Sequence, residues 1–185
     1  GFDKYMQIVR CFRDEDLRAD RQPEFTQIDL EMSFVDEEDI FAVNEGFLVQ
    51  LFKEAMGLDI KVPLKRLTYS QAMTRFGSDK PDTRFDMELQ DVSSLVSTSD
   101  FKVFTNAVES GGSVRCIVVK RGAELISRRE LDIYAEFVKT YKAKGLAWLS
   151  VKAEGLQSPF AKFMSQAQLS SILNNTKAET GDMLL

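Results

Sequence analysis

The sequence predicts an α+β fold of two modules, each combining antiparallel strands with helices. Residues 25–35 alternate between apolar and polar side chains, which is typical of a half-buried antiparallel strand. Segments 36–57 and 128–144 instead carry apolar residues at helical spacing. With 44% hydrophobic and 29% charged residues, the composition is that of a globular protein and excludes collagen, low-complexity disorder and a disulfide scaffold.

Two strands are expected at the start of the chain, over residues 5–12 and 25–35. The apolar face of the second strand is expected to cover a core; it consists of Ile28, Leu30, Met32 and Phe34. The opposite face presents Gln27, Asp29, Glu31 and Ser33. Between the strands, eight of the twelve residues 13–24 are charged, and this connection is longer than common hairpin loops of about 2–5 residues.

Two helices should follow. Asp36 is a suitable N-cap with acidic residues after it, and Gly57 supplies a stop. The apolar stripe of this helix is expected to be core and consists of Ile40, Val43, Phe47, Leu48, Leu51 and Phe52. A helix over 69–76 begins with Thr68 and Gln71 in capping-box spacing and closes at Gly77.

Turn residues at 77–82 mark a boundary, so we expect one module over 1–88 and a second over 89–185. In the second module Ser127 and Glu130 again have capping-box spacing. Strands are predicted at 101–106, 114–120 and 146–152, and helices at 128–144 and near 166–175. The start at Gly1 and the apolar run at 181–185 lead us to expect a fragment that ends within a strand.

Several classes of function are disfavoured by composition. The chain has no histidine, and Cys11 and Cys116 form no C-x-x-C pair, which nearly excludes structural zinc and Cys/His or Ser/His catalysis. A reducing, cytoplasmic compartment fits best. The net charge of −5 argues against general polyanion binding, so nucleic-acid contact would need a local arginine cluster. No apolar stretch approaches the roughly 20 residues of a membrane span.

The charged loop offers two interpretations. Arg13, at a strand end, could bind a phosphate with two parallel hydrogen bonds, and Arg18 and Arg21 suit the backbone phosphates of a nucleic acid. Alternatively the loop is a solvated turn with weak ion pairs. The polar face of the second strand also allows two interpretations. Asp29 and Glu31 could hold an ammonium group in a pocket, or they could simply face solvent. A metal needs more ligands, so no metal site is assigned.

Residues 12–29 read FRDEDLRADRQPEFTQID and closely resemble motif 2 of class II aminoacyl-tRNA synthetases of the bacterial aspartyl type. The resemblance continues through GSDKPDTR at 77–84. Residues 89–185 resemble the GAD insertion domain, which these enzymes place between motifs 2 and 3 and share with a subunit of the tRNA-dependent amidotransferase. The resemblance thus covers essentially the whole chain.

The resemblance implies a role for several residues. Arg13 matches the arginine that binds the ATP α-phosphate and the amino-acid carboxylate and stabilises charge as aspartyl-adenylate forms. Glu15 matches a contact to the adenine end of ATP, and Gln22 a further ATP contact. Asp29 matches the carboxylate near the substrate α-amino group. The loop that meets the acceptor end of tRNA contains Arg18 and Arg21.

Parts of the family pattern are missing: motif 1, the Gly-rich motif 3 with its arginine, and the anticodon-binding barrel. We therefore expect this chain alone not to activate aspartate. The resemblance implies a longer cytoplasmic, homodimeric parent, without a membrane segment, that uses aspartate, tRNA and ATP with Mg²⁺ whose ligands lie outside this chain. The alternatives are a non-catalytic RNA- or protein-binding module built on the insertion domain, and a paralogue that has lost tRNA charging.

The remaining features have structural interpretations. Trp148, in an apolar strand, is expected to be core rather than a stacking platform for RNA. Cys11 and Cys116 are expected to be buried thiols in strands. A solvated face is the preferred interpretation of the basic residues of the 128–144 helix, which are Arg128, Arg129, Lys139, Lys142 and Lys144.

Overall fold

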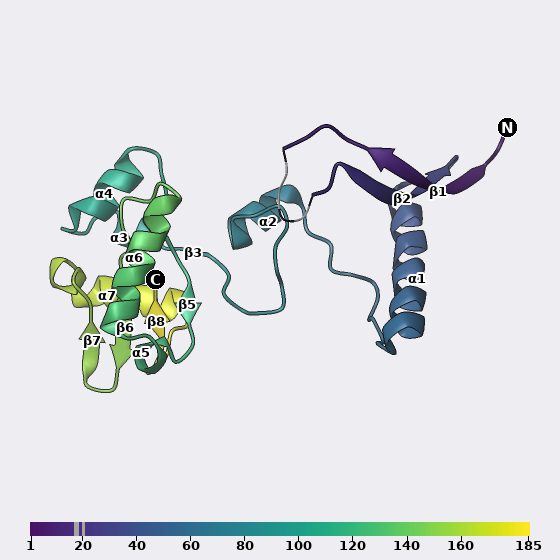
Figure 1. Cartoon of the computed structure of the whole chain (residues 1–185). Helices are drawn as coiled ribbons and strands as arrows, with labels where there is room; N and C mark the ends of the chain where they lie inside the picture. Colours follow the sequence, from purple (N-terminus) through teal and green to yellow (C-terminus); the bar gives the residue numbers. More distant parts are fainter. Residues whose placement is uncertain (17–18, 20) are drawn as a thin grey trace. The chain divides into compact units, whose positions relative to one another are not determined.

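A computed structural model describes residues 1–16, 19 and 21–185 (Figure 1). The chain forms two compact units, the N-terminal unit Gly1–Arg66 and the C-terminal unit Leu67–Leu185. Each unit mixes helices with antiparallel strands, which confirms the predicted α+β class. Division by contacts falls earlier than the expected boundary after residue 88, and the assignment of 1–88 and 89–185 as separate domains stays a prediction.

The N-terminal unit begins with a long hairpin made of β1 (Lys4–Phe12) and β2 (Glu24–Met32). The strands pair antiparallel along their whole length, from Lys4 opposite Met32 to Phe12 opposite Glu24. One further hydrogen bond, from the Arg13 N–H to the Pro23 carbonyl at 2.8 Å, extends the ladder into the loop. Both predicted strands are present, but β2 ends at Met32 rather than at residue 35. Phe34, which was expected on its apolar face, lies beyond the strand with φ 60° and is exposed.

Helix α1 (Glu37–Met56) follows, as predicted, between its N-cap Asp36 and Gly57 in the left-handed conformation (φ 67°). The expectation that its apolar stripe is core is wrong, because α1 has no buried residue and Phe47 is 45% exposed. The apolar face of β2 is likewise open, with Ile28 49% exposed. Within the described part of this unit, too little packs against either surface to bury it.

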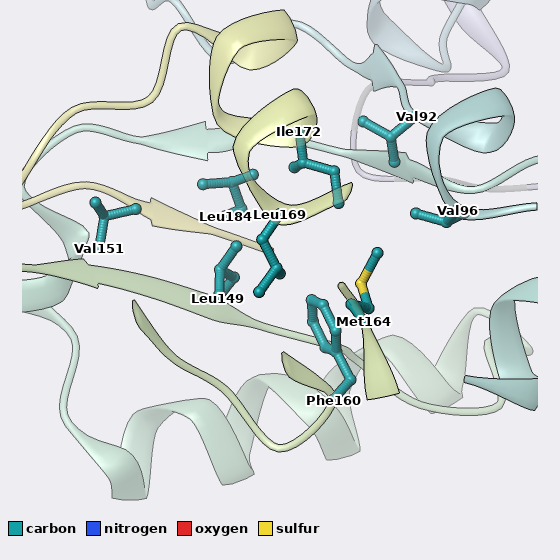
Figure 2. Close-up of a cluster of buried hydrophobic side chains, with 9 residues drawn as sticks. All are labelled: Val92, Val96, Leu149, Val151, Phe160, Met164, Leu169, Ile172 and Leu184. Carbon is teal, nitrogen blue, oxygen red and sulfur yellow. The ribbon is translucent and has the colours of Figure 1, made fainter. Parts of the chain in front are cut away.

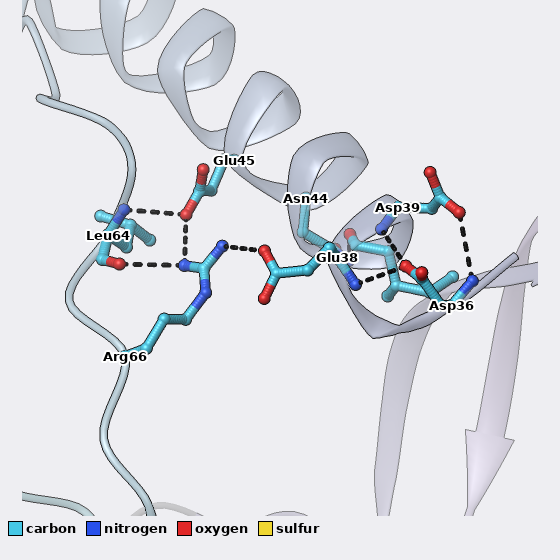
Figure 3. A network of polar contacts seen from close by, with 8 residues as sticks. Asp36, Glu38, Asp39, Asn44, Glu45, Leu64 and Arg66 are labelled. Atoms are coloured by element: carbon cyan, nitrogen blue, oxygen red, sulfur yellow. Dashed lines mark hydrogen bonds and ion pairs between the residues drawn. The ribbon is translucent and has the colours of Figure 1, made fainter.

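Arg66 holds the segment after α1, around Leu64, against the helix (Figure 3). Glu45 accepts hydrogen bonds from Arg66 Nη1 at 2.5 Å and from the Leu64 N–H at 2.8 Å. A second carboxylate, Glu38, lies 3.5 Å from Arg66, and the guanidinium stands 4.2 Å over the Phe41 ring. The hydrogen bond from Arg66 is the main reason that the pKa of Glu45 lies below its usual value.

The C-terminal unit contains more and shorter elements. They are α2 (Tyr69–Phe76), β3 (Gln90–Asp91), α3 (Ser93–Val96), α4 (Lys102–Glu109), β4 (Arg115–Cys116), β5 (Val118–Val119), α5 (Gly122–Leu125), α6 (Arg128–Thr140), β6 (Leu149–Lys152), β7 (Gly155–Gln157), the 3₁₀ turn η1 (Ala161–Phe163), α7 (Gln166–Thr176) and β8 (Met183–Leu184). Strands β3 and β4 form a pair, and an antiparallel sheet has the order β5-β8-β6-β7. The capping boxes predicted for α2 and α6 are present.

The core of this unit lies between the sheet and α7 (Figure 2). Leu169 and Ile172 of α7 meet Leu149 of β6 and Leu184 of β8. Leu149 is 1% exposed, so it is sealed from water almost completely. The unit therefore folds around apolar side chains of its own.

Four predictions for this unit need correction. The strand predicted at 101–106 is the helix α4, because Phe101 and Phe104 are three residues apart and pack edge to face at 4.8 Å on one helical side. The predicted strand 114–120 is divided into β4 and β5. The strand predicted from 146 begins only at Leu149, and α6 ends at Thr140 rather than 144.

Candidate active site

The hairpin presents the predicted polar row on one face. In the observed register, odd-numbered residues of both strands share a side of the sheet. This site face consists of Tyr5, Gln7, Val9, Cys11, Phe25, Gln27, Asp29 and Glu31. Its middle is half-buried, whereas the opposite, apolar face is exposed.

Asp29 is held by two glutamines. Gln7 Nε2 donates to Asp29 Oδ2 at 3.0 Å, and Gln27 Nε2 lies 3.5 Å from Asp29 Oδ1. The Cys11 thiol in turn lies 3.6 Å from Gln27 Oε1. Both carboxylate oxygens thus face neutral amide donors, and no cation among the described residues forms an ion pair with Asp29. The group is oriented without being neutralised, which suits a carboxylate that binds an ammonium ligand.

Arg13 follows directly after β1. Its backbone N–H bonds to Pro23, and its guanidinium stands 5.4 Å over the Phe25 ring. The side chain is exposed, and no carboxylate within the described part of the chain forms an ion pair with it. An arginine that is steadied by an aromatic ring and has free N–H donors can bind a phosphate or a carboxylate.

The loop brings together two residues that were predicted to touch different ligands. Arg21 Nη1 donates to Glu15 Oε2 at 2.7 Å, with both side chains partly exposed. Gln22 is exposed. The predicted tRNA contact Arg18 lies outside the described residues. An exposed ion pair of this type contributes little to stability, about 0–1 kcal/mol, so ligands can open it at small cost.

Arg13 and Asp29 lie on the same face but not side by side. Asp29 pairs with Gln7, which is six residues before Arg13 along β1, a separation of about 20 Å at the usual rise per strand residue. Phe25 and Gln27 lie between them. The Arg13 guanidinium, which lies over the Phe25 ring, covers part of this separation.

Sequence reasoning missed Gln7 and Cys11 as members of this site. Their side chains join it because the hairpin register sets Gln7 opposite Asp29 and places Cys11 next to Gln27. Gln7 also lines a polar hollow of about 520 Å³, together with Tyr5 and Glu31. The alternation in 25–35 was visible in the sequence, but nothing local to Gln7 indicated its partner.

The C-terminal unit contains a larger cavity of about 1050 Å³ with a mostly apolar lining. Trp148 lies on its wall, half-buried and one residue before β6, so the prediction of a strand-core tryptophan is wrong; the Arg128 guanidinium stands 5.2 Å over its ring. Cys116 also lines the cavity. Burial raises the pKa of the Cys116 thiol to about 11, which keeps it protonated near neutral pH.

Two further observations bear on the chemistry. Both cysteines are free and lie in strands as expected, Cys11 in β1 and Cys116 in β4, but they are half-buried rather than buried. Residues 1–16, 19 and 21–185 contain no group of three or more Cys, Asp or Glu side chains arranged to hold a metal ion. In the same part of the chain, every helix is too short or too polar to span a bilayer.

The hairpin thus carries an arginine with free N–H donors and a carboxylate without an ion pair on one side. The family described as tRNA synthetases class II (D, K and N) matches residues 1–184. The chain therefore belongs to the class II tRNA synthetases.

Within this family, the chain is similar to bacterial aspartate–tRNA ligases. The chain is 58% identical over all 185 residues to an aspartate–tRNA ligase of Ruminiclostridium cellulolyticum, and 56% and 54% identical to those of Clostridium perfringens and Clostridium acetobutylicum. These findings confirm the resemblance to the bacterial aspartyl type. In each case the chain covers 31% of the relative's length.

Proposed function

We propose that this chain is the part of an aspartate–tRNA ligase that carries motif 2 of the active site, joined to a GAD-like insertion domain over 89–185. The observation that carries the proposal is that Arg13, just after β1, and Asp29, farther along on β2, lie on the same side of the hairpin and neither side chain forms an ion pair with a described residue. An aminoacyl-adenylate carries an anionic phosphate and a cationic ammonium group, which are the two kinds of group that Arg13 and Asp29 are suited to bind.

In the first step, an oxygen of the α-carboxylate of the substrate aspartate attacks the α-phosphorus of ATP. The bond from that phosphorus to the bridging oxygen breaks, and pyrophosphate leaves. Negative charge increases at the reacting phosphoryl group, and the Arg13 guanidinium stabilises it electrostatically without transferring a proton. Asp29 binds the α-ammonium group and thereby orients the attacking carboxylate.

In the second step, the terminal ribose hydroxyl of tRNA attacks the aspartyl carbonyl and AMP leaves. We assign Glu15 and Gln22 to ATP, and Arg18 and Arg21 to the acceptor end of tRNA. The Glu15–Arg21 pair is exposed, so both partners can exchange it for ligand contacts. ATP would enter with Mg²⁺, whose protein ligands we place outside this chain.

The longer enzyme would work as a cytoplasmic homodimer, and this chain alone would not activate aspartate. The open apolar surfaces of α1 and β2 support the second point, because a site face on an unsupported hairpin is not rigid enough for catalysis.

The test is aspartate-dependent ATP–pyrophosphate exchange by the full-length enzyme. Arg13→Ala should lower kcat/KM by about 10²–10³-fold, the usual loss for one electrostatic stabiliser of a transition state. Arg10→Ala is the matched control, because Arg10 is an exposed arginine of the same strand that pairs with Glu24 at 3.1 Å. An unchanged rate for Arg13→Ala would instead favour a non-catalytic binding module.

A further inference from the structure

Gln7 and Asp29 are a directly opposed cross-strand pair of the hairpin. Opposed side chains have Cβ atoms about 4.5–5.5 Å apart, which lets a glutamine amide reach a carboxylate on the facing strand. The observed distance of 3.0 Å from Gln7 Nε2 to Asp29 Oδ2 is that of a good hydrogen bond. Both residues are half-buried, so solvent competes only partly for this contact.

The chemistry of the donor matters as much as the distance. A carboxylate only accepts hydrogen bonds, so the amide nitrogen of Gln7 must face Asp29 and its oxygen must point elsewhere. A glutamine fixes the carboxylate without cancelling its charge, whereas a lysine or arginine at this position would neutralise it. Gln27 approaches the other oxygen at 3.5 Å, which is longer, so Gln7 makes the stronger of the two contacts.

We propose that Gln7 is a positioning residue for amino-acid binding: its amide holds the Asp29 carboxylate in the orientation that receives the substrate ammonium group. The inference rests on the proposed role of Asp29 and assigns a function to a side chain on the neighbouring strand. Gln7 also borders the polar hollow lined by Tyr5 and Glu31, so the amide lies at an opening rather than in a sealed core.

The test uses the full-length enzyme and separate KM values for aspartate and ATP. Gln7→Met keeps the length of the side chain and removes the hydrogen bond. It should raise the KM for aspartate about tenfold, as expected for one hydrogen bond to a charged group, and leave kcat and the KM for ATP within about twofold. Gln50→Met is the matched control, because Gln50 makes the same kind of bond, to Glu54 at 2.9 Å, on the exposed surface of α1.

A second variant separates positioning from simple hairpin stability. Gln7→Glu places another carboxylate beside Asp29, and two adjacent carboxylates share a proton, which raises an apparent pKa of the pair. The KM for aspartate should then rise as the pH falls from 8 to 6, while the wild-type value changes less. If Gln7 had only a structural role, the substitution would lower thermal stability and kcat and raise both KM values, without this pH dependence.

The outcomes separate the two proposals. Absence of aspartate-dependent exchange in the wild-type enzyme would overturn the proposed function. If the wild type is active and Asp29→Asn raises the KM for aspartate, an unchanged KM in Gln7→Met would overturn only the role of Gln7. Equal increases in both KM values would also overturn it.

Discussion

The two units of the chain differ in what they contain: one carries the candidate site, and the other contains the buried core. The described residues of the N-terminal unit include no buried side chain, yet this unit carries Arg13 and the site face with Asp29. The C-terminal unit has a sealed apolar core and a large cavity with a mostly apolar lining. The candidate site and the buried core therefore lie in different stretches of the sequence.

This contrast shows what an apolar pattern can and cannot reveal. Helix α1 and helix α7 are both capped, and both carry apolar residues at helical spacing. Only α7 buries them, because β6 and β8 lie against it, whereas Phe47 of α1 remains 45% exposed. Periodicity reports a surface that can be buried; burial also requires a partner surface within the folded unit.

The largest expected effect is on a core leucine. Leu149→Ala should lower the free energy of unfolding by about 2–5 kcal/mol, since it removes buried methyl groups and leaves a cavity. The matched change in the other unit, Phe47→Ala, should cost less than about 1 kcal/mol, because its side chain already meets water. Urea unfolding of the 185-residue chain, followed by circular dichroism, measures both. Equal losses of unfolding free energy in the two variants would contradict the contrast between a buried core in one unit and an open apolar surface in the other.

A smaller effect should appear at acid pH. Burial by itself would raise the pKa of Asp182, but hydrogen bonds from Lys120 and from the N–H groups of Glu179 and Arg121 outweigh it and lower the pKa. A lowered pKa stabilises the fold above the unfolded value of about 3.9, and this stabilisation is lost as the pH falls through the folded value.

Asp182→Asn keeps an acceptor oxygen and removes the titrating charge. Its urea midpoint at pH 7 should lie below that of the wild type, by less than the shift caused by Leu149→Ala, and should fall less steeply below pH 4. Midpoints measured from pH 7 to pH 2.5 test this. A slope as steep as that of the wild type would show that other carboxylates control the acid response.

The smallest effect concerns helix caps. Ser165 caps α7 and accepts a hydrogen bond from the Gln168 N–H at 3.2 Å, so Ser165→Ala should cost about 1 kcal/mol in cooperative unfolding. Asp36→Ala removes the cap of α1 and should reduce helical signal without moving the cooperative midpoint. If both substitutions shifted the midpoint alike, the units would be unfolding as one.

Much of the local structure could be predicted from sequence. The alternation in 25–35 identified β2 and its two faces, and the residue pairs Thr68 with Gln71 and Ser127 with Glu130 located two helix starts. These signals are local, since they depend on residues within one turn or one strand. The family resemblance also came from a contiguous segment.

Predictions that required tertiary knowledge were wrong or missing. Phe101 and Phe104 have strand-forming side chains, yet they occupy one face of a helical turn because they pack against each other and against Phe160. Trp148 has Arg128 over its ring instead of a sealed core. The contact of Gln7 with Asp29 depends on the hairpin register, which the strand sequences alone do not specify.

Hydrogen–deuterium exchange on the 185-residue chain tests the division between the units most directly. Amides of β6, β8 and α7 should exchange only through cooperative unfolding and respond to urea together. Amides of α1 should exchange faster and independently of urea, since its helix lacks a core. Protection of α1 equal to that of α7 would contradict the account, because the site-bearing unit would then have a stable core of its own.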